Sequence, residues 1–371
     1  MTPWPIPSGP GATAWTPEQV TADPYNAQTP AAALAEPVTP VGAFFVRDHF
    51  GTPRTTPSRW RLRVGGAVAA PLDIGYDELA ALQRRELDVV LECAGNGRSL
   101  MTPRPPGLPW GQRAVGCAHF AGVPFRALAA RAGIEPGAVE VVFAGADSGT
   151  VHGLPTAFER SLPLEAALHP DTLLATHMNG EPLAPEHGAP VRLVVPGRYA
   201  VADVKWLVEA RAVTEPFTGV FQAEEYVYAA SLGIPEGPVT TVRIKSHITE
   251  PEPDAAIRRG HEAVVRGHAW SGGGVPVRRV EVRAENEEGE GNGEGEGEDC
   301  GREWHDAVLE PSAGPYGWTG WSYRWTPQRP GPYRLLSRAT DALGDTQPPR
   351  APWNAHGYGC NPVASVAVVV V

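Results

Sequence analysis

The sequence predicts an α+β fold in which a mixed domain of short strands and helices precedes an all-β sandwich domain. Its 371 residues are too many for one small module and suit two domains. Glycine and proline supply 42 and 40 residues, which favours many turns over long helices. After about Gly237 the apolar segments all have the length and alternation of strands. We therefore expect an extended N-terminal segment over residues 1–40, a first domain over 41–237 and a second over 238–371.

The first domain mixes strands and helices without a regular alternation, which favours an α+β layer over a doubly wound sheet. Helical patterns cover residues 76–85 and 123–132, and Gly133 closes the second of them. Asn179 and Gly180, between extended runs, are a strong hairpin signal. Apolar runs predict strands at residues 60–66, 87–91, 139–143, 191–197 and 204–213.

The second domain is predicted to be an antiparallel sandwich whose strands are joined by Pro/Gly turns. The strand-like segments are residues 241–251, 261–270, 277–285, 305–311, 321–327, 331–341 and 363–371. An acidic Gly/Glu tract, Glu285–Asp299, lies between two of them and carries eight acids and no base. Such a composition is typical of a solvated hairpin insertion rather than of a binding element.

The net charge and the N-terminal sequence argue against several classes of partner and location. The net charge of −11 falls to −3 outside the acidic tract, so no basic surface for nucleic acid is expected. The first basic residue is Arg47, so no positively charged leader is expected, and we predict a cytoplasmic protein. The apolar run at residues 363–371 is too short for a bilayer core of about 30 Å, so we expect no membrane association.

One cysteine stands out as a candidate for chemistry. The sequence contains no C-x-x-C pair, P-loop or G-x-S-x-G motif. Cys93 lies where a buried strand opens into a Gly-Asn-Gly loop, with Arg98 five residues later. We expect this arrangement to expose the sulfur and to lower its pKa below about 8.5, as a metal-binding thiolate requires. The alternative is a small buried core residue, which is the commoner role of a single cysteine.

A second constellation is cationic. His187, Arg192 and Lys205 interrupt an otherwise apolar stretch, and Arg47 and His49 follow three apolar residues in the same way. Buried strands do not carry cations without an anionic partner. Nearby carboxylates are one possible partner. Together with an exposed thiol, however, the two stretches suggest an anionic, phosphate-bearing cofactor that also supplies a metal.

Six segments, taken in order, resemble the molybdenum-cofactor-dependent sulfite oxidase family in its haem-free bacterial form. They are FFVRDH, LECAGNGR, GADSG, MNGEPLAPEHGAPVRLVVPG, VKWL and WNAHGY. The likeness extends from about Val41 to the C-terminus, and the spacings agree as well as the residues. It implies a mixed α+β molybdopterin-binding domain over 41–237, followed by an immunoglobulin-like dimerisation domain over 238–371 that forms a homodimer.

The resemblance also implies a set of site residues. Cys93 corresponds to the metal ligand, Arg47 and Arg98 to the anion pocket, and Tyr226 to a tyrosine beside the metal; these four form the expected catalytic set. The implied cofactor contacts are Val46, Arg47, Asp48, His49, Cys93, Asp147, His187, Arg192, Asp203, Val204 and Lys205. A half-buried interface aromatic is the alternative for Tyr226.

The implied reaction is the oxidation of sulfite to sulfate by oxygen-atom transfer at an oxo-molybdenum centre, in which the protein supplies position and charge. Electrons are expected to pass to oxygen or to an external carrier, and we expect no haem. One alternative is a molybdenum enzyme that acts on another sulfur compound or reduces S-oxides. An alternative of another class is a dimer that holds the cofactor without turnover.

Four positions depart from the family pattern and bear on the substrate. Asp48 stands where asparagine is common, and we expect its carboxylate to weaken the hold of Arg47 on an anion. Phe120 replaces a pocket tryptophan and removes an indole donor. His356 stands where many members carry an arginine. Arg198 replaces an apolar or aromatic residue and is a candidate compensating cation.

Overall fold

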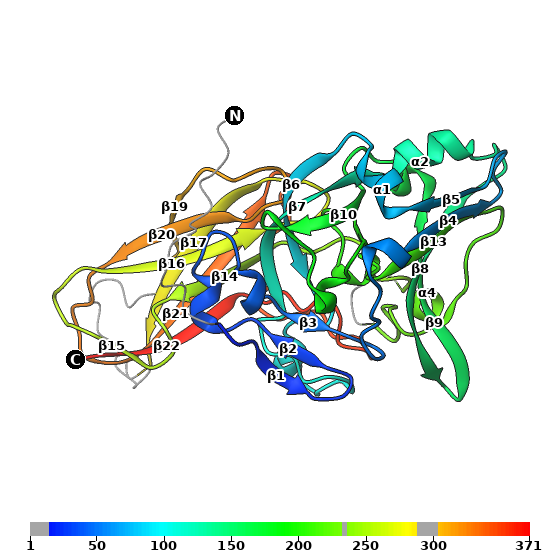
Figure 1. Cartoon of the computed structure of the whole chain (residues 1–371). Helices are drawn as coiled ribbons and strands as arrows, with labels where there is room; N and C mark the ends of the chain where they lie inside the picture. Colours follow the sequence, from blue (N-terminus) through cyan, green and yellow to red (C-terminus); the bar gives the residue numbers. More distant parts are fainter. Residues whose placement is uncertain (1–14, 232–235, 288–302) are drawn as a thin grey trace.

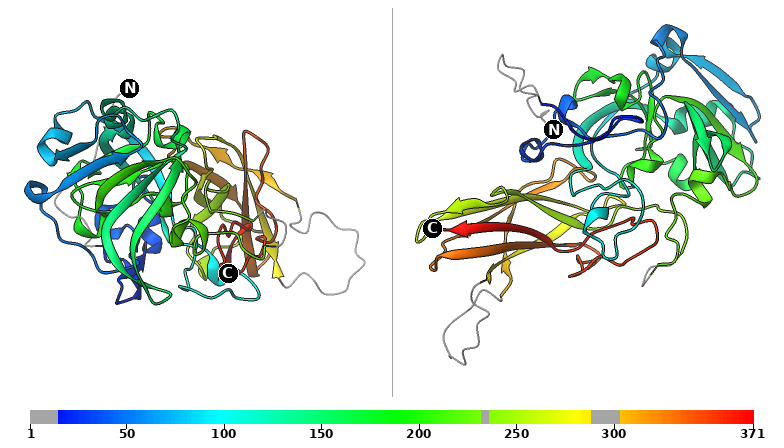
Figure 2. Two further views of the ribbon diagram at one scale, coloured as in Figure 1. Left: turned by 90° about the vertical axis from the view of Figure 1, so that its right-hand side faces the viewer. Right: turned by 90° about the horizontal axis from the view of Figure 1, so that it is seen from below.

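The computed structural model describes residues 15–231, 236–287 and 303–371, which fold into two domains (Figure 1). Figure 2 shows the second domain lying beside the first and extending away from it toward the C-terminus. The predicted fold class is confirmed, because a mixed domain with short helices precedes a domain of two packed sheets.

One sheet of the first domain presents Cys93. Its strands are β6 (Arg85–Glu92), β7 (Val115–Pro124), β10 (Leu173–Met178), β11 (Glu181–Pro182) and β12 (Arg192–Val194). They pair antiparallel in the order β11-β10-β7-β6, with β12 also on β10. Asn179 and Gly180 connect β10 to β11 with positive φ angles of 52° and 84°, so the predicted tight hairpin is confirmed.

A second sheet of this domain presents Asp147. It has the order β5-β4-β13-β8-β9, and β13 runs parallel to β4. The bounds are β4 (Arg61–Gly66), β5 (Leu72–Gly75), β8 (Glu140–Val151), β9 (Leu154–Pro163) and β13 (Leu207–Val213). The pairing of β8 with β9 shifts register between Ala144 and Ser148, so the strand is irregular around Asp147.

The helices of the first domain are short. They are α1 (Tyr76–Ala80), α2 (Phe125–Ala132), α3 (Leu164–Ala167) and α4 (Val220–Ala223). Single 3-10 turns are η1 (Ala31–Leu34), η2 (Val41–Ala43), η3 (Pro57–Arg59), η4 (Arg98–Leu100), η5 (Pro185–His187) and η6 (Ala200–Ala202). α2 ends at Gly133 as predicted, with a φ of 66°. The helix predicted over 76–85 is wrong beyond Ala80, because pairing with β7 already draws Arg85 into β6.

The N-terminal segment wraps onto the first domain over its described part. β1 (Glu18–Thr21) and β2 (Asn26–Gln28) form a hairpin, and β2 pairs with β3 (Val46–Arg47). An ion pair between Glu18 and Arg113 fastens this hairpin. Farther along, the indole nitrogen of Trp318 in the second domain donates to the carbonyl of Pro37 at 2.8 Å. The segment therefore contacts both domains and delivers Arg47 to its place.

The second domain is the predicted sandwich, and its strands pair antiparallel except for β15, which runs parallel to β22. One sheet has the order β14-β16-β20-β19 and the other β15-β22-β21-β17-β18. The bounds are β14 (Lys245–Glu250), β15 (Ala255–Ile257), β16 (Ala263–Trp270), β17 (Val277–Asn286), β18 (His305–Asp306), β19 (Val308–Leu309), β20 (Thr319–Trp325), β21 (Gly331–Asp341) and β22 (Ala364–Val370). Glu285 belongs to β17, and the predicted insertion from residue 288 to 299 lies outside the described residues. In the part of the chain that is described, no helix is long and apolar enough to cross a bilayer.

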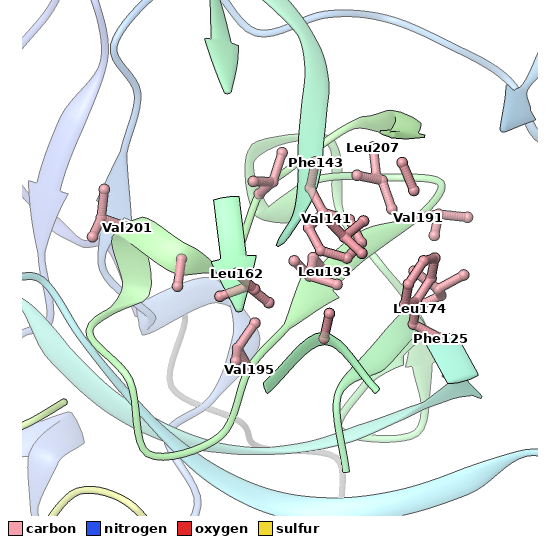
Figure 3. Close-up of a cluster of buried hydrophobic side chains, with 14 of the residues drawn as sticks. Phe125, Val141, Phe143, Leu162, Leu174, Val191, Leu193, Val195, Val201 and Leu207 are labelled. Carbon is pink, nitrogen blue, oxygen red and sulfur yellow. The ribbon is translucent and has the colours of Figure 1, made fainter. Parts of the chain in front are cut away.

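The core of the first domain joins its two five-stranded sheets. Phe125 on α2 meets Phe143 on β8 edge to face, with ring centroids 4.9 Å apart. Figure 3 shows this cluster, in which the labelled side chains are Phe125, Val141, Phe143, Leu162, Leu174, Val191, Leu193, Val195, Val201 and Leu207. The packing holds β12 and the loop before β13 against the sheets, and these segments carry Arg192 and Lys205.

A buried histidine makes folding stability depend on pH. His268 on β16 stacks on Trp318 at 4.3 Å, and burial lowers its pKa to about 4. Because the unfolded chain has a histidine pKa of about 6.5, it takes up this proton first as the pH falls. We therefore expect the free energy of unfolding to decrease as the pH falls below 6.5, by about 2 kcal/mol at pH 5.

The measurement is chemical unfolding at pH 7 and pH 5 for the wild type and His268→Phe, which keeps an aromatic ring on Trp318. The wild type should lose about 2 kcal/mol more than the variant on acidification. Exposed His261, changed to Phe, is the matched control and should follow the wild type. Equal losses in the wild type and His268→Phe would contradict the assignment.

Candidate active site

Two cavities meet at Arg47, Cys93 and Tyr226, which line both. The inner cavity encloses about 640 Å³ and the outer about 890 Å³, each with its open mouth included. Both volumes suit a small organic ligand. The inner cavity is further lined by His49, Asp147, His187, Arg192, Asp203 and Lys205. The outer cavity is further lined by Arg98, Trp110, Glu225, His356 and Tyr358, the last two from the second domain.

Cys93 follows directly on β6, at the junction of the two cavities. Its backbone N–H donates to the carbonyl of Ala114 at 2.9 Å, and its own carbonyl accepts from Asn96 at 2.9 Å. The prediction of an exposed sulfur with a lowered pKa is wrong, because Cys93 is only 6% exposed and burial raises the thiol pKa. Arg47 and Arg98 act in the opposite direction, but the loss of hydration outweighs them.

Arg192 and Lys205 bring positive charge into the inner cavity. Arg192 begins β12 and donates to the carbonyls of His187 at 3.1 Å and Asp203 at 3.3 Å. Lys205 donates to the carboxylate of Asp48 and, at 2.9 Å, to the carbonyl of Glu186. Burial lowers the pKa of both cations. A buried cation favours an anionic ligand because the ligand replaces the water that it has lost.

A glycine allows these two side chains to approach. Gly188 ends η5 with a φ of 99°, a conformation that other residues rarely adopt. A Cβ at this position would lie 3.0 Å from the Cβ atoms of Arg192 and Lys205. Gly188 therefore lets the backbone after His187 pass close to both Arg192 and Lys205.

Three buried polar atoms on the cavity wall have no hydrogen-bond partner among the described residues. They are Oδ1 of Asp147, Oδ2 of Asp203 and Nε of Arg192. Burial raises the pKa of each carboxyl to about 7. An unpaired buried polar group costs about 1–3 kcal/mol, so the cavity is suited to a ligand that offers both donors and acceptors. A pterin with a phosphate tail has this character, and these residues fit it. No group of three or more described His, Cys, Asp or Glu side chains is arranged to hold a metal ion.

Two histidines on the inner wall are neutral. Burial lowers the pKa of His187 to about 3, and its Nε2 donates to the carbonyl of Val41 at 3.1 Å. Burial, reinforced by Arg47, also lowers the pKa of His49 well below its usual value. Nε2 of His49 is 2.6 Å from the hydroxyl of Tyr226. The phenol oxygen is therefore fixed at the junction between the cavities.

An aromatic stack forms one wall of the outer cavity. Tyr226 stacks on Tyr358 with centroids 5.0 Å apart, and His356 stacks on the same ring at 5.8 Å. Burial raises the pKa of Tyr226, so its hydroxyl keeps its proton. Arg98 lies 5.1 Å from the Tyr358 ring and donates to the carbonyls of His356 at 2.8 Å and Leu108 at 3.1 Å.

The structure brings most of the residues singled out by the sequence to these cavities. Arg98 lines the outer cavity, and Arg47, Cys93 and Tyr226 line both. Six more of them line the inner cavity: His49, Asp147, His187, Arg192, Asp203 and Lys205. Three expected contacts do not line either cavity: Val46, Asp48 and Val204. They are at most 3% exposed, and Asp48 contacts two residues of the wall, Lys205 through its carboxylate and Arg47 through its backbone carbonyl.

The four departures from the family pattern take particular positions. The Asp48 carboxylate binds Lys205 and Thr52, and its backbone carbonyl accepts from Arg47; the expected weakening of the hold of Arg47 on an anion stays a prediction. Phe120 is fully buried and lines neither cavity. Arg198 is also absent from both cavity walls. His356 does lie on the outer wall.

Sequence reasoning missed two supporting residues. Asn26 on β2 is 1% exposed, and its Oδ1 accepts from the backbone N–H of Asp48 at 3.0 Å and from Arg47 at 3.3 Å. Arg160 on β9 is 3% exposed and lies beneath Tyr226, 6.0 Å from its ring. Burial lowers the pKa of Arg160 to about 10. The only available sequence signal was an arginine in a largely apolar strand.

Comparisons with known families agree with this arrangement. Residues 49–221 match the family described as "Oxidoreductase molybdopterin binding domain". Residues 237–370 match the "Mo-co oxidoreductase dimerisation domain". The first match contains the inner cavity's charged residues from His49 to Lys205, and the second contains His356 and Tyr358.

Similar proteins extend the likeness along the chain. Sulfite oxidase of Gallus gallus is 34% identical over 361 residues, covering 90% of this chain and 74% of that protein. Mitochondrial sulfite oxidase of Drosophila melanogaster is 32% identical over 383 residues, covering 94% of this chain and 62% of that protein. The chain thus spans less than two thirds of the Drosophila protein. The solved structure of the sulfane dehydrogenase SoxCD from Paracoccus pantotrophus matches with a TM-score of 0.81 and 26% identity, over 98% of this chain and 92% of that one. The chain belongs to the sulfite oxidase family of molybdopterin-binding oxidoreductases.

Proposed function

We propose that this chain is a molybdopterin-dependent enzyme that oxidises sulfite to sulfate. One observation carries the proposal: the inner cavity, with unpartnered buried donors and acceptors, opens at Cys93 into an outer cavity that holds two arginines. The likeness to sulfite oxidases of two animals supports the choice of substrate. We propose that the boundary between the molybdopterin-binding domain and the dimerisation domain lies between residues 237 and 238.

The inner cavity would hold the molybdopterin. Arg192, Lys205 and neutral His187 would hold its phosphate, and the unpartnered oxygens Oδ1 of Asp147 and Oδ2 of Asp203 would accept hydrogen bonds from its pterin nitrogens. Cys93 is the thiol placed to bind the metal, and a soft sulfur donor suits molybdenum. When bound, this cofactor supplies the oxygen atom and accepts the two electrons of the oxidation.

The side chains around the outer cavity bind and orient the substrate. Sulfite is a small oxyanion, and planar guanidinium groups hold two oxygens each. Nη1 of Arg47 is held by Asn26, and Nε and Nη1 of Arg98 by backbone carbonyls, so both forks have fixed directions. Tyr226, hydrogen-bonded to neutral His49, presents its hydroxyl beside them. Together these groups would hold the oxygens of sulfite in one orientation.

The test combines metal analysis with an assay on protein made in a host that synthesises the cofactor. We expect about one molybdenum per chain and sulfite-dependent reduction of ferricyanide. Full molybdenum without sulfite turnover would reject sulfite as substrate, and an S-oxide reductase would show itself by reoxidising a reduced dye with an S-oxide. Absence of molybdenum would favour a structural dimer. Elution volume checks the proposed homodimer.

Asn26 gives a separate prediction for substrate binding. Asn26→Ala removes the oxygen that orients Arg47, so we expect the KM for sulfite to rise by about tenfold, a typical effect of losing a supporting residue. The measurement is steady-state kinetics per molybdenum. Thr21→Val breaks the hydrogen bond from Asn26 Nδ2, at 2.8 Å, in the same hairpin without touching Arg47. A KM unchanged in Asn26→Ala, or raised equally in Thr21→Val, would contradict the role.

A further inference from the structure

The residue before Cys93 is a buried carboxylate with three donors. Glu92 ends β6 and is 0% exposed. Its Oε1 accepts from Nδ2 of Asn96 at 3.0 Å and from Nζ of Lys245, and its Oε2 accepts from Nε1 of Trp270 at 2.8 Å. Burying a carboxylate is costly unless it is paired and hydrogen-bonded in this way.

Two of these donors come from the second domain. Lys245 begins β14 and Trp270 ends β16, and the two residues are directly opposite each other in the antiparallel pair. Lys245 is 8% exposed and Trp270 2%, so both reach Glu92 through packed protein. A strand pair is a stiff support, because each donor is held by the ladder as well as by its own packing.

The second domain also contacts the loop that follows Cys93. The backbone N–H of Gly359 donates to the carbonyl of Ala94 at 2.9 Å. Gly97 has a φ of 86°, and a Cβ there would lie 3.1 Å from the sulfur of Cys360. Asn96 links these contacts, since its Oδ1 accepts from Ala114 N–H at 3.1 Å while its amide donates to Glu92. Cys93 therefore sits between a strand end and a loop that are both fixed from outside the first domain.

We propose that Lys245 and Trp270 are positioning residues, through which the second domain holds the Cys93 sulfur at the metal by way of Glu92. This inference rests on the proposed function, because it takes Cys93 as the metal ligand. It assigns to the second domain a part in building the first domain's cofactor site. Neither residue touches the cavities; each acts through Glu92 on the backbone that carries the thiol.

The experiment uses the full chain, loaded in a host that makes the cofactor. The readouts are molybdenum retained per chain after prolonged dialysis and the sulfur-to-metal charge-transfer absorption that a bound thiolate produces. Lys245→Met leaves the Glu92 carboxylate without its cation, and Trp270→Phe removes one donor while keeping an aromatic side chain. We expect molybdenum retention to fall about tenfold in Lys245→Met and less in Trp270→Phe, with a shifted charge-transfer band in both.

Two further variants separate positioning from general weakening. The double variant Glu92→Gln with Lys245→Gln replaces the ion pair by a neutral amide pair, and we expect it to restore retention and the band. Tyr316→Phe breaks another contact between the domains, the 2.9 Å hydrogen bond to Asp171, and should leave both readouts unchanged.

The inference is overturned if Lys245→Met keeps the wild-type band and retention. It is also overturned if Tyr316→Phe lowers them equally, or if the double variant behaves like Lys245→Met. If the Lys245→Met variant does not fold, Trp270→Phe and the double variant still test the positioning role. A wild-type protein without molybdenum would instead contradict the proposed function itself, so the two failures are distinguishable.

Discussion

Replacing Cys93 with serine is expected to abolish sulfite turnover while the fold is retained. The side chain lies at the junction of both cavities, and a hydroxyl is a harder and weaker donor than a thiolate for a sulfur-rich metal site. We expect kcat to fall beyond the roughly 10–100-fold that accompanies loss of a supporting residue. Serine is nearly the same size as cysteine, so the packing around position 93 should change little.

The measurement is turnover per folded chain, with unfolding temperature and circular dichroism as checks on structure. Cys117→Ala is the matched control, since Cys117 is also buried, at 1% exposed, but lines neither cavity. Burial raises the pKa of the Cys117 thiol to about 12, so it has no thiolate character to lose. If the Cys93→Ser variant kept wild-type turnover, the assignment of Cys93 as the metal ligand would be wrong.

Changing Lys205 to methionine is expected to have the second largest effect, on both stability and cofactor content. Lys205 is the cation paired with Asp48, whose side chain is 1% exposed. Without it the Asp48 charge is buried and uncompensated, which costs about 3–5 kcal/mol of folding stability. The inner cavity also loses one of the three cations that line it, so we expect little molybdopterin to be retained.

A double variant separates these two losses. Asp48→Asn removes the stranded charge, so Asp48→Asn with Lys205→Met should recover most of the stability and still bind little cofactor. Asp48→Asn alone frees Lys205 from its partner and should hold the cofactor at least as well as the wild type. Chemical unfolding and molybdenum content measure the two effects. Full cofactor content in the double variant would show that Lys205 serves only to neutralise Asp48.

The sequence was sufficient for features that depend on local pattern. The α+β order followed from turn spacing and strand length, and the Asn179-Gly180 hairpin from the positive φ angles that these residues accept. His187, Arg192 and Lys205 were recognisable as site candidates, since cations in an apolar stretch require a partner. The hairpin signal and the cationic signal each lie within about twenty residues of sequence.

Features that depend on distant packing were not accessible. The pKa of Cys93 rises because burial outweighs two arginines, and burial is decided by segments from both domains. Asn26 meets Arg47 across a sheet that the Pro- and Ala-rich N-terminal sequence did not suggest. Lys245 reaches Glu92 across 153 positions of chain. The end of α1 at Ala80 was set by pairing of the next strand with β7, which no helical pattern could reveal.

The outer cavity has a consequence for the order in which the protein folds. Its wall combines segments far apart in the sequence, from Arg47 on β3 to Tyr358, which follows β21. Tyr358 of the second domain stacks on Tyr226 of the first, so this side of the wall forms only when the two domains have docked. We expect a chain whose second domain is unfolded to lack it.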